Sequence, residues 1–127
     1  MTILFMCAAN SVRSQLAEGL ARKYLQDHKV LSAGAGSSHV NPVVIDVLKD
    51  LEDIDATTHS SKSVDEIDTD KVDLTIAVCG ESVIPQRLLQ KRHLVWPFSV
   101  PTGRSGMEAL ALQLKKKILQ LKKELEK

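Results

Sequence analysis

Three side chains near the start of the chain have types and spacing suited to nucleophilic chemistry on an anion. Cys7 follows the apolar run Ile3–Met6, and Arg13 and Ser14 come after five further residues that are small or polar. A run with helical spacing begins at Ser11. A thiol between a buried strand and a helix start, with an arginine six positions later, indicates an anion site that contains a nucleophile.

The loop between Cys7 and Arg13 can curl so that its backbone N–H groups point inward, backed by the positive end of the helix that follows. Such a nest binds a tetrahedral oxyanion. Arg13 adds a bidentate guanidinium that lysine would not reproduce, and the same positive surroundings stabilise a thiolate. The hydroxyl of Ser14 can hydrogen-bond this thiolate. The residues predicted to bind the oxyanion are Ala8, Ala9, Asn10, Ser11, Val12 and Arg13.

A plainer interpretation makes Cys7 a buried core cysteine and Arg13 a solvated helix residue, because cysteine is commonly buried. The strand before the thiol, the helix after it and the serine beside the arginine favour the reactive interpretation.

The elements that must position these residues alternate between strands and helices. This alternation predicts an α/β fold with a parallel sheet covered on both faces. The predicted strands are Ile3–Met6, Lys29–Ser32, Leu74–Val78 and Leu94–Trp96; the predicted helices run from Ser11 to Leu25, from Asn41 to Leu51 and from Gly103 to Lys127, with a short helical turn around Val64–Ile67.

A second cysteine, Cys79, comes directly after the predicted strand Leu74–Val78. Ligands of parallel sheets bind beyond the carboxyl ends of the strands. If this strand is a neighbour of the first, Cys7 and Cys79 lie close together at one edge of the sheet. The alternative is that Cys79 is an inert thiol at the end of a strand.

Composition limits the possible functions. The chain has 127 residues, a net charge of +1 and 3% aromatic residues, so we expect one domain over residues 1–127 and no nucleic-acid or membrane partner. Ile3–Met6 is too short for a signal peptide. We therefore expect a cytoplasmic monomer whose cysteines are reduced thiols. The four histidines show no ligand spacing, and no metal site is expected.

The segment "FMCAANSVRSQLAEGLAR" resembles the active-site segment of the low-molecular-weight protein tyrosine phosphatase family. It is most similar to the family's thioredoxin-coupled arsenate reductase branch, because Ser14-Gln15 stands where the tyrosine phosphatases usually carry serine-proline. The resemblance extends over nearly the whole chain, and it includes the segments "SAGAGSSHVNPVVIDVLKDLEDID", "HSSKSVDEID", "LTIAVCGESVIP" and "HLVWPFSVP".

This resemblance implies a three-layer sandwich whose four parallel strands lie in the order 2-1-3-4. It also implies an arsenate reductase without a cofactor. The Cys7 thiolate would attack arsenate, Cys79 would attack the Cys7 sulfur, and arsenite would leave. Thioredoxin, glutaredoxin or a small thiol would then reopen the disulfide. Under this interpretation Cys7, Arg13, Ser14 and Cys79 are the catalytic residues.

The sequence departs from the family pattern at the cysteines and at the general acid. Ile84 stands where many members carry a third cysteine, and Val12 where some carry another. A Cys7–Cys79 disulfide would then be opened by an external thiol, or a small thiol would resolve the adduct on Cys7 itself. Val100 occupies the place of the usual general-acid aspartate. Its loss should harm hydrolysis of a phosphate ester more than reaction with arsenate, whose oxygens exchange more readily.

A further departure is Lys62, which stands where some arsenate reductases use an aspartate, together with Asn10 and Glu18, to hold a potassium ion. We expect its ammonium to lie near those two residues in place of the ion, and we expect no potassium dependence. The alternative is that Lys62 is solvated surface.

Three functions thus remain open from the sequence. The first is an arsenate reductase. The second is a low-molecular-weight phosphatase that forms a phosphoenzyme on Cys7, and the third is a protein that binds oxyanions without turnover.

Overall fold

A four-stranded parallel sheet forms the centre of the protein. The computed structural model describes all residues from 1 to 127. The strands are β1 (Thr2–Cys7), β2 (Lys29–Gly34), β3 (Leu74–Ala77) and β4 (His93–Val95), and their order is β2-β1-β3-β4. This confirms the predicted α/β fold and the predicted strand order.

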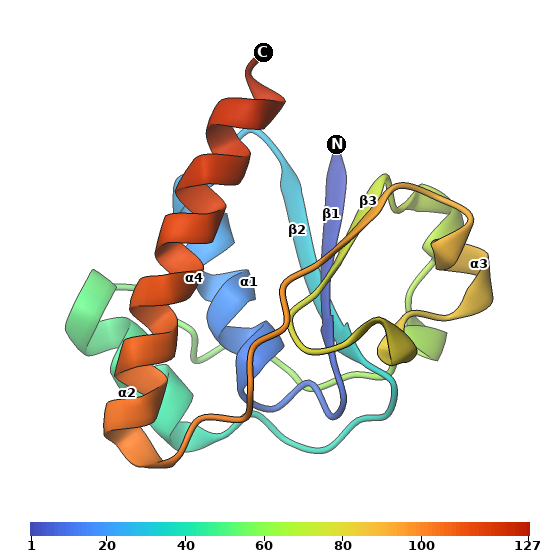
Figure 1. The fold of residues 1–127 in the computed structure, drawn as a ribbon. Coiled ribbons are helices and arrows are strands. Elements are labelled where there is room, and N and C mark those ends of the chain that lie inside the picture. Colours follow the sequence, from blue (N-terminus) through green and yellow to red (C-terminus); the bar gives the residue numbers. More distant parts are fainter.

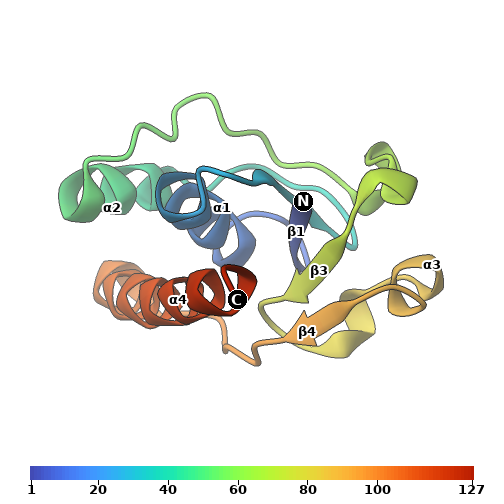
Figure 2. The same ribbon diagram turned by 90° about the horizontal axis from the view of Figure 1, so that it is seen from above.

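Helices cover both faces of the sheet, as Figures 1 and 2 show. Helices α1, α2 and α4 pack together on one face, while α3 and short 3-10 turns lie on the other. The helices are α1 (Arg13–Tyr24), α2 (Pro42–Glu52), α3 (Gln86–Leu89) and α4 (Gly103–Leu125), and the 3-10 turns are η1 (Val64–Glu66), η2 (Thr69–Lys71) and η3 (Glu81–Val83).

The alternation of side chains along β1 divides the core in two. Ile3, Phe5 and Cys7 belong to the larger cluster beneath α1, α2 and α4, whereas Leu4 and Met6 belong to a smaller cluster on the other face. Successive side chains of a strand point to opposite faces, so Cys7 faces the layer that contains α1. The nucleophile candidate therefore lies at the carboxyl end of the strand, under the start of α1.

The two long helices that follow β1 and β2 begin in different ways. Helix α2 has a local start signal: the side chain of Asn41 accepts a hydrogen bond from the N–H of Val43 at 2.9 Å, and Pro42 occupies the first helical position. Helix α1 begins after Val12 without a side-chain cap. The first N–H groups of α1 therefore remain available to another partner.

Most differences from the predicted elements are small. Turn η1 lies where a helical turn was predicted, and α4 ends at Leu125. The pattern did not predict η2, η3 or α3, because elements of three or four residues are too short to show a hydrophobic period. No helix is both long and apolar enough to cross a lipid bilayer.

A carboxylate at the end of α2 joins the three helices of the larger layer. Glu52 accepts hydrogen bonds from Tyr24 and Lys23 of α1, and from Lys115 of α4 at 3.1 Å. Burial alone would raise the pKa of Glu52, but the hydrogen bonds from Tyr24, Lys115 and Lys23 hold it below its ordinary value of 4.5. The ionised carboxylate thus favours the folded state.

We expect Glu52→Gln to lower the free energy of unfolding at pH 7 by about 1 kcal/mol, because charged hydrogen bonds are lost. The contribution of Glu52 is present above its ordinary pKa and is lost as the pH falls toward the lower pKa of the folded state. Chemical denaturation between pH 7 and pH 3 should therefore show the variant and the wild type converging. Asp50→Asn, which breaks the exposed pair with Arg104, should change stability by less than about 0.5 kcal/mol. A difference that stays constant with pH would contradict this account.

Candidate active site

The segment that joins β1 to α1, residues 8–12, forms a tight loop over Cys7. Gly34, at the end of β2, lets this loop pack closely, since a Cβ at that position would lie 2.8 Å from both the Ala8 carbonyl oxygen and the Asn10 nitrogen. Asn10 itself has a left-handed backbone with φ of 53°. Asparagine tolerates this conformation better than most residues, so the loop's sharp turn has a local cause in the sequence.

In this loop the backbone carbonyls are paired, and the backbone N–H groups are not. Every carbonyl from Cys7 to Val12 accepts a hydrogen bond from the surrounding protein, whereas no N–H of residues 8–14 donates one. The donors to these carbonyls are the N–H groups of Ala35, Gly36, Asn41 and Leu16, the hydroxyl of Ser61 and the amide of Gln15. These N–H groups, at the start of a helix without a side-chain cap, are therefore available to a tetrahedral anion.

Ser14 points its proton at the candidate nucleophile. The carboxamide of Asn10 has one possible orientation, because its oxygen accepts from the main-chain N–H of Lys62 at 2.9 Å. Its nitrogen therefore donates to Ser14 Oγ at 2.8 Å. Since Ser14 Oγ accepts that bond, its own proton is directed to Cys7 Sγ, 2.9 Å away. A hydroxyl that donates to sulfur stabilises the thiolate over the thiol.

Asn10 is held in turn by Gln15 and His59. The Gln15 nitrogen donates to Asn10 Oδ1 at 3.0 Å and to the Ser60 carbonyl at 3.0 Å, so the Gln15 oxygen faces His59 Nδ1 at 3.0 Å and accepts its proton. Asn10 belongs to the loop before α1, Gln15 to α1, and His59 to the segment between α2 and β3. The main-chain N–H of Lys62 thus fixes the orientation of the Asn10 carboxamide, which in turn fixes the direction of the Ser14 proton.

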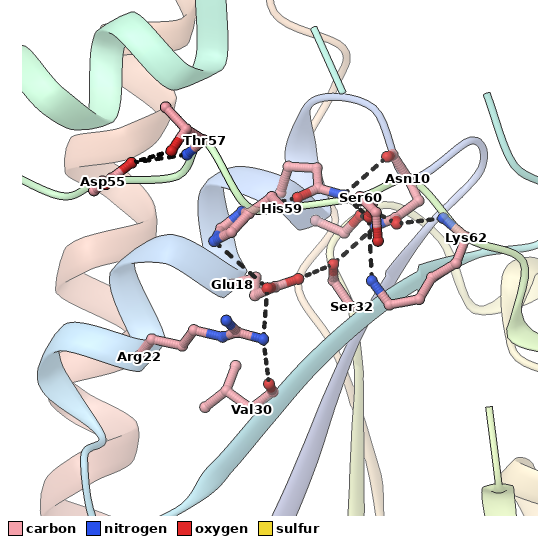
Figure 3. Close-up of polar contacts among 12 residues, drawn as sticks. Asn10, Glu18, Arg22, Val30, Ser32, Asp55, Thr57, His59, Ser60 and Lys62 are labelled. Atoms are coloured by element: carbon pink, nitrogen blue, oxygen red, sulfur yellow. Dashed lines mark hydrogen bonds and ion pairs between the residues drawn. The ribbon is translucent and has the colours of Figure 1, made fainter. Parts of the chain in front are cut away.

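A buried carboxylate lies beneath this network (Figure 3). Glu18 is 2% exposed; it accepts the hydroxyl proton of Ser32 and pairs with Arg22 at 2.9 Å. His59 Nε2 lies 3.5 Å from the same carboxylate, which is longer than a normal hydrogen bond. Burial lowers the pKa of His59, against the opposing effect of Glu18. The contact of the ring that is a normal hydrogen bond is the one from Nδ1 to the Gln15 oxygen.

Lys62 lies differently from our expectation. Its ammonium donates to the Ser60 carbonyl at 3.1 Å and forms no ion pair with Glu18, whose partners are Arg22 and His59. Only the main-chain N–H of Lys62 contacts Asn10. Arg22 already supplies a fixed positive charge at the carboxylate, so Lys62 is not needed there.

Arg13, the first residue of α1, contacts the segment after β4. Its Nη1 donates to the Phe98 carbonyl at 2.9 Å, and the guanidinium forms no ion pair with any carboxylate. Its positive charge is therefore free to meet an anion. Val100, two residues further on, has 68% of its surface exposed, and it carries no group that can transfer a proton.

Cys79 lies at the same end of the sheet as Cys7, just beyond the carboxyl end of its strand. Strands β1 and β3 are neighbours, with Met6 opposite Ala77, so the two cysteines follow adjacent strands at the same edge. Cys79 also packs against the larger core cluster to which Cys7 belongs. Both cysteines are free thiols; Cys7 is buried and Cys79 is partly exposed.

The residues that the sequence analysis missed are Gln15, Ser32 and His59. A signal existed for the first, because Gln15 and Glu18 are polar residues three positions apart on the inward, otherwise apolar face of α1. Ser32 and His59 had no such signal. No group of three or more His, Cys, Asp or Glu side chains is arranged to hold a metal ion.

The sequence and the fold are similar to those of known proteins. The pattern of the low molecular weight phosphotyrosine protein phosphatase family matches residues 2–127, and the chain belongs to this family. Arsenate reductase 1 of Bacillus cereus (strain ATCC 10987 / NRS 248) is 41% identical over 106 residues, which cover 81% of this chain and 78% of the relative. Arsenate reductase 2 of Staphylococcus saprophyticus is 38% identical over 113 residues, 84% of this chain and 83% of the relative.

A solved structure of an arsenate reductase in its phosphate-binding state has a TM-score of 0.85 and 28% identity to this protein. The superposition covers 94% of this chain and 95% of that one. The fold is therefore that of the low-molecular-weight phosphatases.

We expect Ser14→Ala to slow alkylation of Cys7 by iodoacetamide about tenfold at pH 7, because one hydrogen bond to a charged sulfur is worth about 1.5 kcal/mol. The rate can be followed by mass spectrometry of the peptide that contains Cys7. Ser105→Ala, an exposed serine on α4, is the matched control and should leave the rate unchanged. Equal rates in the wild type and Ser14→Ala would show that Ser14 does not stabilise the thiolate.

Proposed function

We propose that this protein reduces arsenate to arsenite through a thiolate at Cys7. The observation that carries the proposal is that the N–H groups of residues 8–14 have no protein acceptor and directly follow the buried Cys7, with Arg13 among these residues. Relatives that share 38–41% of their residues with the matched part of this chain are arsenate reductases, which supports arsenate as the substrate.

In the proposed first step, the Cys7 thiolate attacks arsenic, and an oxygen of arsenate leaves as water after taking up protons. The N–H groups of the loop and the Arg13 guanidinium hold the remaining oxygens and offset the negative charge that develops on them. The product is a covalent Cys7–arsenate adduct in which arsenic is still in its +5 state.

In the second step, the Cys79 thiolate attacks the Cys7 sulfur. A sulfur–sulfur bond forms, the sulfur–arsenic bond breaks, and its electron pair passes to arsenic, which leaves as arsenite. The positions of Cys7 and Cys79 after adjacent strands support this route. Two equivalents of an external thiol, supplied by thioredoxin, glutaredoxin or a small thiol, then reduce the disulfide. We place the reaction in the cytoplasm, where thiols are kept reduced.

The residue at position 100 favours arsenate over a phosphate ester. An ester must expel an alkoxide or phenoxide, which needs a proton from a general acid, and such assistance is worth about 10²–10⁴-fold. Val100 supplies no proton, whereas the leaving oxygen of arsenate can be protonated from the bound anion itself.

The test compares wild type, Cys7→Ser and Cys79→Ser in assays of arsenite formation with a thioredoxin system and, separately, with glutathione. We expect Cys7→Ser to be inactive, since it lacks the nucleophile. The thioredoxin-dependent turnover of Cys79→Ser should be at least tenfold lower than that of the wild type. Normal turnover by Cys79→Ser would exclude the disulfide route. A wild type that binds arsenate but forms no arsenite would identify an oxyanion-binding protein without turnover.

A second candidate function is hydrolysis of phosphate monoesters, because the family and the oxyanion loop are shared with phosphatases. We expect weak aryl phosphate hydrolysis by the wild type and an increase of at least tenfold in Val100→Asp, which restores an acid at the exposed loop. Val100→Asn is the matched control and should not gain activity. Efficient hydrolysis by the wild type, unchanged in Cys79→Ser, would instead make phosphatase the principal function.

A further inference from the structure

We propose that an external thiol reopens the Cys7–Cys79 disulfide by attacking the sulfur of Cys79, so that Cys7 leaves as a thiolate. This inference rests on the proposed function, because it concerns the disulfide formed in its second step. It assigns different roles to the two sulfurs during reduction, and three features of the site support it.

The first feature is the lack of any further thiol in the chain. Cys7 and Cys79 are the only two cysteines. Ile84, downstream of Cys79, is 4% exposed and packs in the smaller core cluster with Leu4 and Met6. This buried anchor restrains the segment that follows Cys79. The thiol that opens the disulfide must therefore come from another molecule.

The second feature is access. Thiol–disulfide exchange requires the attacking sulfur to approach in line with the sulfur–sulfur bond. Cys7 is 2% exposed and lies against Ser14, which is fully buried, so a thiol would have to enter the oxyanion loop to reach it. Cys79 is partly exposed, and the next three residues, Gly80, Glu81 and Ser82, are exposed. Cys79 is thus the more accessible of the two sulfurs to an external thiol.

The third feature is the difference between the two leaving groups. A departing Cys7 thiolate receives a hydrogen bond from Ser14 at 2.9 Å, and the residues that follow it, 8–14, have N–H groups without a protein acceptor. The polar contact of Cys79 Sγ is the Gly80 carbonyl oxygen at 3.7 Å, an acceptor that offers nothing to a thiolate. The better-stabilised thiolate leaves faster, so exchange favours attack on Cys79 with departure of Cys7.

Reduction of the disulfide takes place in two thiol–disulfide exchange steps. In the first, the external thiolate bonds to Cys79 Sγ, the Cys7–Cys79 bond breaks, and its electron pair stays on Cys7. In the second, another thiolate attacks the external sulfur of this mixed disulfide, which releases Cys79 as a thiolate and an oxidised disulfide of the reductant. Cys7 is therefore regenerated, ready for the next anion, in the first step.

The test begins with the full chain, oxidised by diamide in the absence of reductant. Intact mass should fall by two hydrogens, and peptide mapping should give a Cys7–Cys79 link. The oxidised protein is then mixed with one equivalent of glutathione, quenched in acid within the first turnover, alkylated and mapped. We expect glutathione on Cys79 and the alkyl group on Cys7.

A kinetic arm tests the leaving group. In oxidised Ser14→Ala, opening by glutathione should slow about tenfold, because the departing Cys7 thiolate loses its hydrogen-bond donor. Oxidised Ser105→Ala should open at the wild-type rate. If attack took place at Cys7, removing the Ser14 hydroxyl would open the path to that sulfur, and the rate would stay the same or rise.

The outcomes separate the two proposals. If no Cys7–Cys79 link forms on oxidation, both the disulfide route and this inference are overturned. If the link forms but glutathione is found on Cys7, or Ser14→Ala opens as fast as the wild type, the route stands and the assignment of Cys79 as the attacked sulfur is wrong.

Discussion

The backbone of the loop over Cys7 has paired carbonyls and unpaired N–H groups, and the rest of the site depends on this arrangement. The carbonyls of residues 7–12 are bonded outward to neighbouring segments, which leaves the N–H groups of residues 8–14 without protein acceptors. An unpaired buried N–H costs about 1–3 kcal/mol unless water or an anion meets it. A small oxyanion would give these N–H groups the acceptors that the protein does not supply, which is why we propose that it binds here.

Asn10 contributes both to the shape of the loop and to the orientation of the side chain that contacts Cys7. Its left-handed backbone makes the turn, and its carboxamide orients Ser14, whose proton faces Cys7. Such a buried polar network is favourable only if each member is satisfied. Here a main-chain N–H at Lys62 and the amide of Gln15 both bond to the Asn10 oxygen, so one orientation is strongly preferred. These hydrogen bonds hold the loop from beneath and fix the direction of its side chains before an anion binds.

The sequence predicted most of the fold and the contact of Ser14 with Cys7, and the physical reason is that their signals are local. The Asn41-Pro42 start of α2, the strands on either side of each helix and the run from Cys7 to Ser14 are all encoded within a few adjacent residues. The network beneath the loop joins Gln15 to His59, which lie far apart in the chain. Such a contact depends on how the segment after α2 crosses α1, and no local pattern specifies that path.

Two segments of this site have separate roles. This separation explains how one fold can support both arsenate reduction and ester hydrolysis. In the proposed reactions, residues 8–14 bind the oxyanion next to the nucleophile Cys7, which both arsenate reduction and ester hydrolysis require. The segment that carries Phe98 and Val100 contacts Arg13 only through a main-chain carbonyl. A side chain at position 100 can therefore change from an acid to a valine without disturbing the oxyanion loop. Selection between substrates can act on this exposed position alone, because the leaving group, not the bound anion, is what differs between the reactions.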